Sequence, residues 1–216
     1  MKALITGASS GIGLEMARIL SREGFELILV AREKEKLQKV QEELGKNVKI
    51  VVADLSNESK LKELYVLCKN DKIDVLINNA GFGMKKRNSG YILNVASMAA
   101  FAPGPLMATY YSTKAYVLRL TTSIYEELRR DKSKVVVSCL CPGPVKTNFN
   151  NVANVKFSVK PLDSKFVAEC ALVGLFNKKL IIIPGFKMRV TNFFTRLAPT
   201  KLAASIAYNI QKKKLY

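Results

Sequence analysis

The stretch TGASSGIG, residues 6–13, connects a buried strand predicted at residues 2–6 to a predicted helix, and its glycines follow the pattern G-x-x-x-G-x-G. Gly7 would permit a tight turn, while Gly11 and Gly13 would let a phosphate approach the backbone and the helix approach the sheet. A helix N-terminus also presents free N–H groups to a pyrophosphate. We therefore expect a dinucleotide site at this turn; a flexible turn without a ligand is the alternative.

Strands and helices alternate along the rest of the chain, which predicts an α/β fold with a doubly wound parallel sheet. At 216 residues a single domain, residues 1–216, is favoured over two. Further strands are expected at residues 25–31, 48–53, 73–77, 91–96, 135–140 and 180–183. Helices are expected at residues 33–44, 58–70, 110–128 and 164–177, followed by two C-terminal helices split near Pro199.

The composition excludes several classes of catalytic and metal site, because the chain contains no His. Without His there is no Ser-His-Asp or Cys-His nucleophile, and the common zinc sites that use His are excluded too. Any acid–base chemistry must therefore use Tyr, Lys, Asp, Glu or Cys, and no metal site is expected. The cysteines form no CxxC pattern, which suits a reducing compartment, and we expect buried thiols at Cys68, Cys139, Cys141 and Cys170.

The formal net charge of +18 admits nucleic acid or anionic lipid as a partner. The basic residues are scattered along the predicted helices, often with Glu between them, so a solvated basic surface is favoured and no nucleic-acid partner is expected. No signal peptide precedes the first strand, and no apolar run approaches the roughly 20 residues of a membrane-spanning helix. A cytoplasmic protein without a transmembrane segment is therefore expected.

The end of the second predicted strand indicates which cofactor the glycine-rich turn would bind. An acidic residue there would bind the free 2′-hydroxyl of the adenosine ribose, but the strand is followed by Arg32, 19 residues after Gly13. An Arg at this place can accept a 2′-phosphate, so NADP is favoured over NAD. The neighbouring Glu33 argues against this assignment, and an ordinary surface Arg is the alternative.

Two further polar residues follow predicted strands, at the edge where open parallel sheets bind ligands. Asp54 follows the third strand and could face a ligand, but it could equally cap the helix that starts near Ser56. Asn79 lies in the stretch NNAG, residues 78–81, after the fourth strand. Its side chain could cross-link neighbouring loops, although a plain turn is the usual meaning of such a composition.

Tyr110 and Lys114 are predicted to share one face of a helix, because residues four apart are neighbours on a helix surface. The ammonium group would lower the pKa of the phenol toward neutral pH, where a general acid and base is most effective. Ser97 follows the fifth strand and precedes Tyr110 by 13 residues, so the intervening loop could bring its hydroxyl beside the Tyr. For the pair alone, a solvated Tyr and Lys is the alternative.

The sixth strand is followed by CPGPVKT, residues 141–147, in which Pro fixes the turn and Gly frees it. Thr147 could therefore hydrogen-bond a ligand at the carboxyl edge of the sheet. The irregular stretch from residue 148 to residue 162 is expected to form a mobile lid over the substrate. This lid carries no interpretable chemistry, so the identity of the substrate does not follow from the sequence.

In this order and spacing, the motifs resemble those of the short-chain dehydrogenase/reductase family over nearly the whole chain. The matching elements are the cofactor turn at residues 6–13, the NNAG segment at residues 78–81, Ser97 as the catalytic Ser, Tyr110 with Lys114 as the YxxxK pair, and Pro142, Gly143 and Thr147 on the nicotinamide side. The resemblance implies a Rossmann-type fold and hydride transfer between a nicotinamide cofactor and a small-molecule carbonyl or alcohol substrate.

The resemblance also implies a role for each matching residue. Tyr110 would exchange a proton with the substrate oxygen, Ser97 would hold that oxygen, and Lys114 would lower the pKa of Tyr110 and bind the nicotinamide ribose. Further cofactor contacts would come from Gly7, Ser9, Gly11, Ile12, Gly13 and Arg32 at the adenosine and phosphate end, Asp54 at the adenine, Asn79 at the middle of the cofactor, and Pro142, Gly143 and Thr147 at the nicotinamide.

One departure from the family concerns the connection between the fourth and fifth strands. Parallel strands need a crossover of a dozen or more residues, usually helical, but only ten residues run from Gly81 to Gly90. Ten helical residues rise about 15 Å, short of the roughly 20 Å that a six-residue strand spans. This indicates an internal deletion of a few dozen residues; the alternative is a sequence joined across an omitted segment of the natural chain. The deletion removes the family's crossover helix and its fourth catalytic residue, an Asn, a role that we assign to neither Asn88 nor Asn94.

The missing helix is expected to weaken both packing and catalysis. It would uncover apolar side chains of the fourth and fifth strands, among them some of Ile73, Val75, Ile77, Ile92 and Val95. A homo-oligomer could cover that face. The alternative to an active oxidoreductase is therefore a catalytically impaired remnant that still binds the cofactor.

Overall fold

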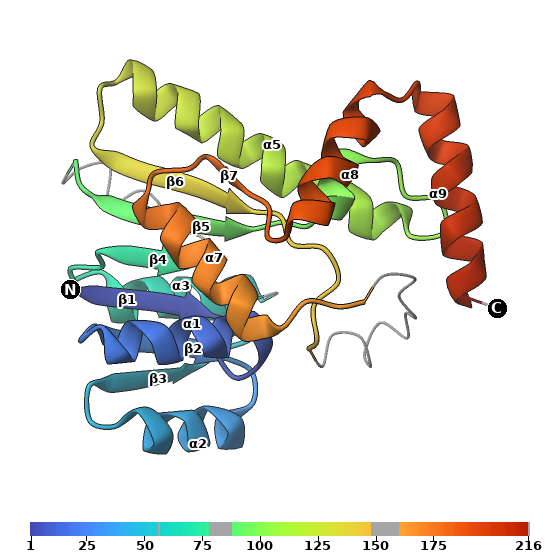
Figure 1. Cartoon of the computed structure of the whole chain (residues 1–216). Coiled ribbons are helices and arrows are strands. Elements are labelled where there is room, and N and C mark those ends of the chain that lie inside the picture. The colour runs from blue at the N-terminus through green and yellow to red at the C-terminus, as the bar shows by residue number, and fades with distance from the viewer. Residues whose placement is uncertain (56, 78–87, 148–159, 216) are drawn as a thin grey trace.

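A parallel sheet runs through the middle of the molecule (Figure 1). The computed structural model describes residues 1–55, 57–77, 88–147 and 160–215. Within them, seven strands pair in the order β3-β2-β1-β4-β5-β6-β7. The strands are β1 (Lys2–Thr6), β2 (Glu26–Ala31), β3 (Val48–Val52), β4 (Val75–Ile77), β5 (Gly90–Val95), β6 (Val135–Leu140) and β7 (Ile181–Ile182). The predicted doubly wound parallel sheet is confirmed.

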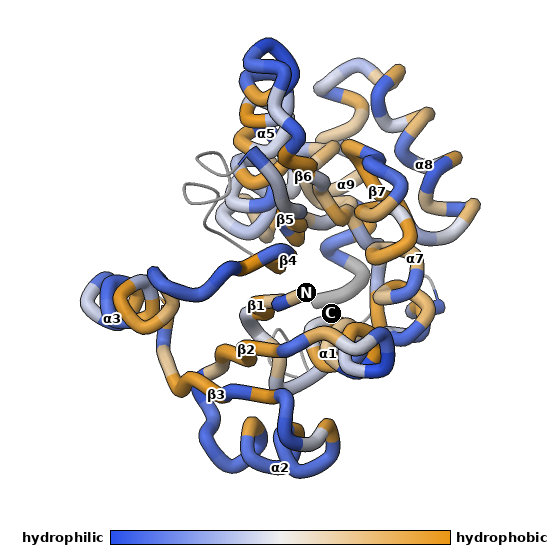
Figure 2. The backbone as a smooth tube through the Cα atoms, turned by 90° about the vertical axis from the view of Figure 1, so that its left-hand side faces the viewer, coloured by the Kyte–Doolittle hydropathy of each residue, from blue (hydrophilic) through white to orange (hydrophobic). Residues whose placement is uncertain are grey.

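Helices cover both faces of this sheet (Figure 2). On one face lie α1 (Gly11–Arg22), α2 (Lys34–Leu44) and α7 (Ser164–Phe176), and on the other lie α3 (Glu58–Cys68) and α5 (Ala108–Arg130). Beyond the carboxyl ends of the strands lie a short 3₁₀ helix, η1 (Met98–Phe101), and two C-terminal helices, α8 (Phe186–Leu197) and α9 (Thr200–Leu215). Because both faces are covered, central strands such as β2 carry continuous apolar runs rather than alternating ones.

Most predicted elements lie within two residues of their expected bounds, and the differences have local causes. β4 begins at Val75 rather than at residue 73, because the Ile73 N–H donates a hydrogen bond of 3.0 Å to the Asp71 carbonyl in a turn instead of pairing with a neighbouring strand. Asp163 caps α7, because its carboxylate accepts hydrogen bonds from the Lys165 and Phe166 N–H groups. The cap of α3 is Asn57 and not Asp54, since the Asn57 side chain accepts the hydrogen bond from the first turn of the helix.

The strands on either side of the short crossover are better covered than expected. The crossover itself falls mostly outside the described residues. Val75, Ile77 and Ile92 are at most 5% exposed, so the expectation that they lose their cover is wrong. Val75 and Ile77 face the side of α1 and α7, and Ile92 packs in the cluster that α3 and α5 cover. Ile73 and Val95 are half-buried.

All four thiols are free, and two of them are less buried than expected. Cys139 and Cys141 are buried in and after β6, whereas Cys68 and Cys170 lie on helices and are half-buried. Burial still raises the pKa of the Cys68 and Cys170 thiols, because it disfavours the thiolate. Among the helices described, none is both long and apolar enough to cross a lipid bilayer.

The described packing predicts a large stability loss on truncation of Leu93, which is fully buried in β5 between two neighbouring strands. We expect Leu93→Ala to lower the free energy of unfolding by about 2–5 kcal/mol, because the cavity it leaves cannot collapse completely. Urea unfolding followed by circular dichroism measures this loss. The control is Leu67→Ala on α3, where the side chain is 53% exposed and a change below about 0.5 kcal/mol is expected. Equal losses of stability in the Leu93→Ala and Leu67→Ala variants would contradict the burial of Leu93.

Candidate active site

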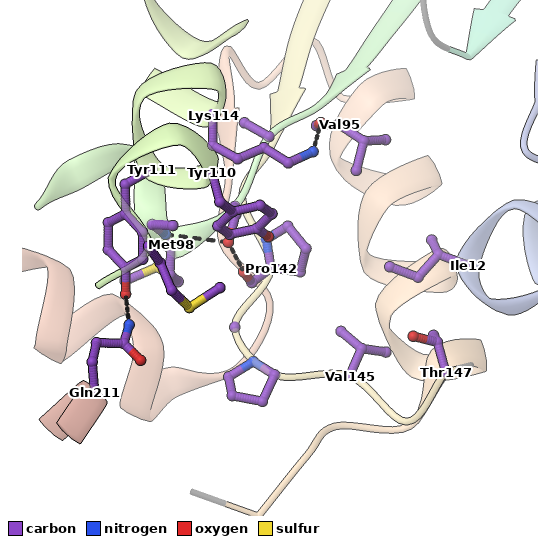
Figure 3. A pocket seen from close by; sticks show the side chains of 16 residues that line it. Ile12, Val95, Met98, Tyr110, Tyr111, Lys114, Pro142, Val145, Thr147 and Gln211 are labelled. Atoms are coloured by element: carbon purple, nitrogen blue, oxygen red, sulfur yellow. Dashed lines mark hydrogen bonds between the residues drawn. The ribbon is translucent and has the colours of Figure 1, made fainter. Parts of the chain in front are cut away.

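A cavity of about 310 Å³ opens at the carboxyl ends of β5 and β6 (Figure 3). Its wall includes residues from the start of α1, the end of β5, the first turns of α5 and the turn after β6. The predicted site residues found there are Ile12, Ser97, Tyr110, Lys114, Pro142, Gly143 and Thr147. Folding thus brings together the motifs that the sequence separates, including all three predicted catalytic residues.

The helix α5 holds Tyr110 and Lys114 one turn apart on the side that faces the cavity, as expected. The Lys114 Nζ lies 5.9 Å from the centroid of the Tyr110 ring, within the range of a cation–π contact. The same Nζ donates a hydrogen bond of 3.1 Å to the Val95 carbonyl (Figure 3). Burial lowers the pKa of Lys114, because a buried ammonium loses its hydration. The amine is thereby fixed between Tyr110 and the end of β5.

Ser97 lies at the junction between β5 and η1, a short helix that was not predicted. Its Oγ accepts a hydrogen bond of 3.2 Å from the Ala99 N–H and so caps η1. The hydroxyl also donates a long hydrogen bond of 3.5 Å to the Pro142 carbonyl. These contacts hold the Ser97 side chain at the cavity wall.

The glycine-rich turn leads into the cavity wall at the start of α1. Gly7 and Gly11 have φ angles of +62° and +59°, which favour glycine. A Cβ on Gly13 would lie only 2.4 Å from the Gly7 carbonyl oxygen, so this turn has no room for a side chain. The turn also approaches the nicotinamide-side segment closely, because a Cβ on Gly11 would lie 2.9 Å from the Thr147 Cγ2. Ser10 precedes α1 without capping it through its side chain.

Other predicted residues lie away from the cavity wall. Within the described part of the chain, those that do not line it are Gly7, Ser9, Gly11, Gly13, Arg32 and Asp54. Arg32 is exposed directly after β2, and Asp54 is exposed shortly after β3, both at the carboxyl edge of the sheet. Asn79 and most of the expected lid lie outside the described residues.

Nine of the cavity-lining residues were not predicted as site residues, and Gln211 of α9 is the least expected of them. Gln211 is only 3% exposed, and its Nε2 donates a hydrogen bond of 2.7 Å to the Tyr111 hydroxyl (Figure 3). Burial raises the pKa of Tyr111, since it disfavours the phenolate. Met98 and Met107 complete this part of the wall. Nothing local marks Gln211, because it directly precedes a run of lysines typical of a solvated helix end.

The two Asn residues near the short crossover have structural partners elsewhere. The Asn88 Oδ1 accepts hydrogen bonds of 2.9 Å from the Ser133 hydroxyl and 2.7 Å from the Lys134 N–H, at the start of β6. The Asn94 Nδ2 donates a hydrogen bond of 3.0 Å to the Thr121 hydroxyl and so joins β5 to α5. Neither Asn88 nor Asn94 lines the cavity.

Comparison with known sequences identifies relatives over most of the chain. The profile of the short chain dehydrogenase family matches residues 1–85 and 82–156. An uncharacterized oxidoreductase of Staphylococcus epidermidis is 30% identical over 209 residues, which cover 80% of this chain and 90% of the relative. An uncharacterized oxidoreductase of Staphylococcus aureus is 29% identical over 224 residues, which cover 87% of this chain and 96% of the relative.

Solved structures with the same fold include enzymes of the same kind. A short-chain dehydrogenase from Sphingobium yanoikuyae in complex with NADPH has a TM-score of 0.79 and 27% identity, covering 89% of this chain and 92% of that one. The bulky-bulky ketone specific alcohol dehydrogenase from Comamonas testosteroni has a TM-score of 0.74 and 27% identity, covering 91% and 92%. Since the family profile matches well over half of its residues, the chain belongs to the short-chain dehydrogenase/reductase family of oxidoreductases.

Proposed function

We propose that this protein is an NADP-dependent oxidoreductase that interconverts a carbonyl and an alcohol in a small-molecule substrate. The observation that carries the proposal is the meeting of Ser97, Tyr110 and Lys114 at one cavity. The cavity also reaches Ile12, in the first turn of α1, so one ligand could extend from the glycine-rich turn to the Tyr hydroxyl.

The residues around the turn fit a nicotinamide dinucleotide. Gly7 and Gly11 adopt glycine conformations, and a phosphate could approach the backbone because no side chain intervenes. The Ser10 side chain does not cap α1, so it does not compete with a pyrophosphate for the first N–H groups of the helix. The turn at Gly7, Ser9, Gly11, Ile12 and Gly13 would hold the phosphates, and Pro142, Gly143 and Thr147 the nicotinamide end. When bound, the nicotinamide supplies or accepts the hydride.

The chain's own residues would manage the proton and the substrate oxygen. Tyr110 would exchange the proton, Ser97 would donate a hydrogen bond that orients the oxygen, and Lys114 would bind the nicotinamide ribose. The Val95 carbonyl restrains the Lys114 amine, so the amine needs little further ordering when a ligand arrives. In this assignment the cavity wall formed by Met98, Met107 and Tyr111 would contact the substrate.

The preference for NADP rests on Arg32. Arg32 is exposed at the end of β2 and forms no ion pair within the described part of the chain, whereas Glu33 pairs with Lys36 at 2.8 Å. The guanidinium is therefore available to a 2′-phosphate. The neighbouring Glu33 carboxylate is paired with Lys36, so it does not occupy the Arg32 side chain. Solved relatives at 26–27% identity include complexes with NADPH and with NADH. Because the relatives bind either cofactor, we base the preference for NADP on the charge of Arg32.

A second candidate is a cofactor-binding remnant with weak catalysis, and two observations favour it. The family profile matches in two segments that meet at residues 82–85, close to the short crossover. The alignment with the Staphylococcus aureus relative spans 224 positions, more than this chain contains, yet covers only 87% of it. Both observations support a deletion of a few dozen residues, which would include the family's fourth catalytic residue.

The acid–base assignment predicts the effect of removing one hydroxyl. We expect Tyr110→Phe to lower turnover of aldehydes and ketones by about 10²–10⁴-fold while leaving the Kd for NADPH within about twofold, because only the exchangeable proton is removed. NADPH oxidation and NADPH fluorescence measure the two quantities. Tyr116→Phe, on the exposed side of α5, is the matched control and should retain full turnover. If both variants stay fully active, Tyr110 is not the acid.

The cofactor assignment predicts a selective loss on changing Arg32. Arg32→Ala should raise the Kd for NADPH by roughly 5- to 150-fold, the equivalent of about 1–3 kcal/mol for a charge-assisted hydrogen bond. The Kd for NADH should change little, since NADH lacks the 2′-phosphate. Arg22→Ala, at the far end of α1, controls for the loss of one positive charge. Equal losses for NADPH and NADH would rule out the 2′-phosphate contact.

If the protein is a catalytically impaired remnant, two properties of the natural protein can be predicted: its mass and its turnover. If the deletion is native, protein purified from its source should have a mass of 24.0 kDa and should turn over slowly even at saturating NADPH, because the fourth catalytic residue is absent. Electrospray mass spectrometry and steady-state kinetics test the two parts. A higher mass, together with peptide masses that place the extra residues between the fourth and fifth strands, would show that the natural chain retains the longer crossover.

A further inference from the structure

The helix α8 exposes its apolar side and turns its more polar side toward the protein. Its large apolar residues recur three and four positions apart and so form one stripe along the helix. This stripe consists of Phe186, Val190, Phe193, Phe194 and Leu197, with exposed fractions from 37% to 78%. The packed side carries Met188, Asn192 and Thr195, which are half-buried. An ordinary surface helix has the opposite orientation, with its apolar stripe toward the core.

A second exposed stripe follows on α9. Leu202, Ile206 and Ile210 are four positions apart and are 44–53% exposed. The side of α9 that packs against the protein is different, because it carries the buried Gln211. Figure 2 shows hydrophobic segments recurring along the outer edge of α8, and Figure 1 shows both helices at the end of the molecule beyond the sheet. We call these two stripes together the C-terminal apolar surface.

The size of this surface exceeds what scattered apolar residues explain. A Phe side chain has an area of about 150–250 Å², and three phenylalanines of α8 are more than 60% exposed. They alone present on the order of 300–500 Å², comparable with the largest apolar patch of a typical monomer. Val190 and Leu197 of the same stripe enlarge it. Patches of this kind ordinarily mark a surface that contacts a partner or a membrane.

The charges that the C-terminal segment itself carries are of one sign. Residues 170–216 contain no Asp or Glu, but nine Lys and Arg residues lie between residue 178 and residue 214. On α8, the helical positions place Lys187 on one flank of the stripe and Arg189 and Arg196 on the other. An anionic partner would therefore meet apolar contact in the centre and positive charge at both margins.

We propose that α8 and α9 bind an anionic membrane surface, lying in its plane with the C-terminal apolar surface inserted among the lipids. Such interfacial helices combine an apolar face with flanking Lys and Arg, whose long side chains reach the headgroups. The absence of a spanning helix among the described residues agrees with attachment at the surface. A second copy fits less well, because the same face of another +18 chain would bring like charges together. Nucleic acid would leave the aliphatic stripe of α9 without a partner.

A single-Trp reporter tests the insertion directly, because the chain contains no Trp. In the full-length Phe194→Trp variant, vesicles of equal parts phosphatidylglycerol and phosphatidylcholine should shift the Trp emission to shorter wavelength. Val66→Trp on α3, at another exposed apolar position, is the matched control and should keep its emission. No shift in the Phe194→Trp variant, or an equal shift in both variants, would overturn the proposal.

Vesicle co-sedimentation separates the apolar and the charged contributions. Phe193→Ser with Phe194→Ser should weaken binding at least tenfold, because two exposed rings no longer enter the lipid, whereas Val66→Ser with Leu67→Ser on α3 should bind normally. Lys187→Gln should weaken binding about fivefold, and Lys39→Gln on α2 should not. Binding should fall as salt rises and should be much weaker for pure phosphatidylcholine.

Three results would refute membrane binding. The unaltered protein could stay in the supernatant with phosphatidylglycerol vesicles, or the α3 variant could lose as much binding as the α8 variant. The Phe194→Trp emission could instead already lie at short wavelength without lipid and move with protein concentration, which would assign the surface to contact between copies of this chain. The affected side chains are exposed, so circular dichroism should show the same helix content in every variant.

Discussion

Hydrogen bonds that continue the pairing of β5 and β6 beyond the strand ends hold the candidate active site together. The Ala96 N–H donates a hydrogen bond of 2.8 Å to the Leu140 carbonyl, and the Met98 N–H donates one of 2.9 Å to the Pro142 carbonyl. Ser97 lies between these two contacts, opposite the turn that follows β6. Because Lys114 also binds a carbonyl at the end of β5, the positions of both residues depend on this strand keeping its register.

Features that depend on short stretches of sequence could be predicted closely. β1 and β6 have the expected bounds, because each is a mostly apolar run that ends at a glycine- or proline-containing turn. The spacing of Tyr110 and Lys114 predicted a shared helix face, and the cavity lies on that face. The glycines of the first turn likewise occupy positions where sterics or a positive φ require them. In each case a local rule was sufficient.

Features that depend on contacts between distant segments could not be predicted. Gln211 lines the cavity only because α9 packs against α5, where its side chain meets Tyr111, 100 residues earlier. The burial of Ile92 depends on how α3 and α5 approach the sheet, so counting helices overestimated its exposure. The periodicity of α8 indicates an apolar stripe but not its direction. The half-burial of Met188 and Asn192, together with the exposure of the stripe itself, shows that the stripe faces outward.

The C-terminal helices attach to the cavity rather than to the core. Within the described residues, the clusters of buried apolar side chains include none from α8 or α9. Their contacts are local instead: Met188 packs against Gly143, Arg196 lies 5.4 Å from the Phe101 ring, and Gln211 binds Tyr111. An exposed apolar stripe that fills neither the core nor the cavity favours aggregation, and the proposed attachment to lipid would cover it. Since α9 carries Gln211 and its own stripe on different sides, that attachment would leave the cavity wall unobstructed.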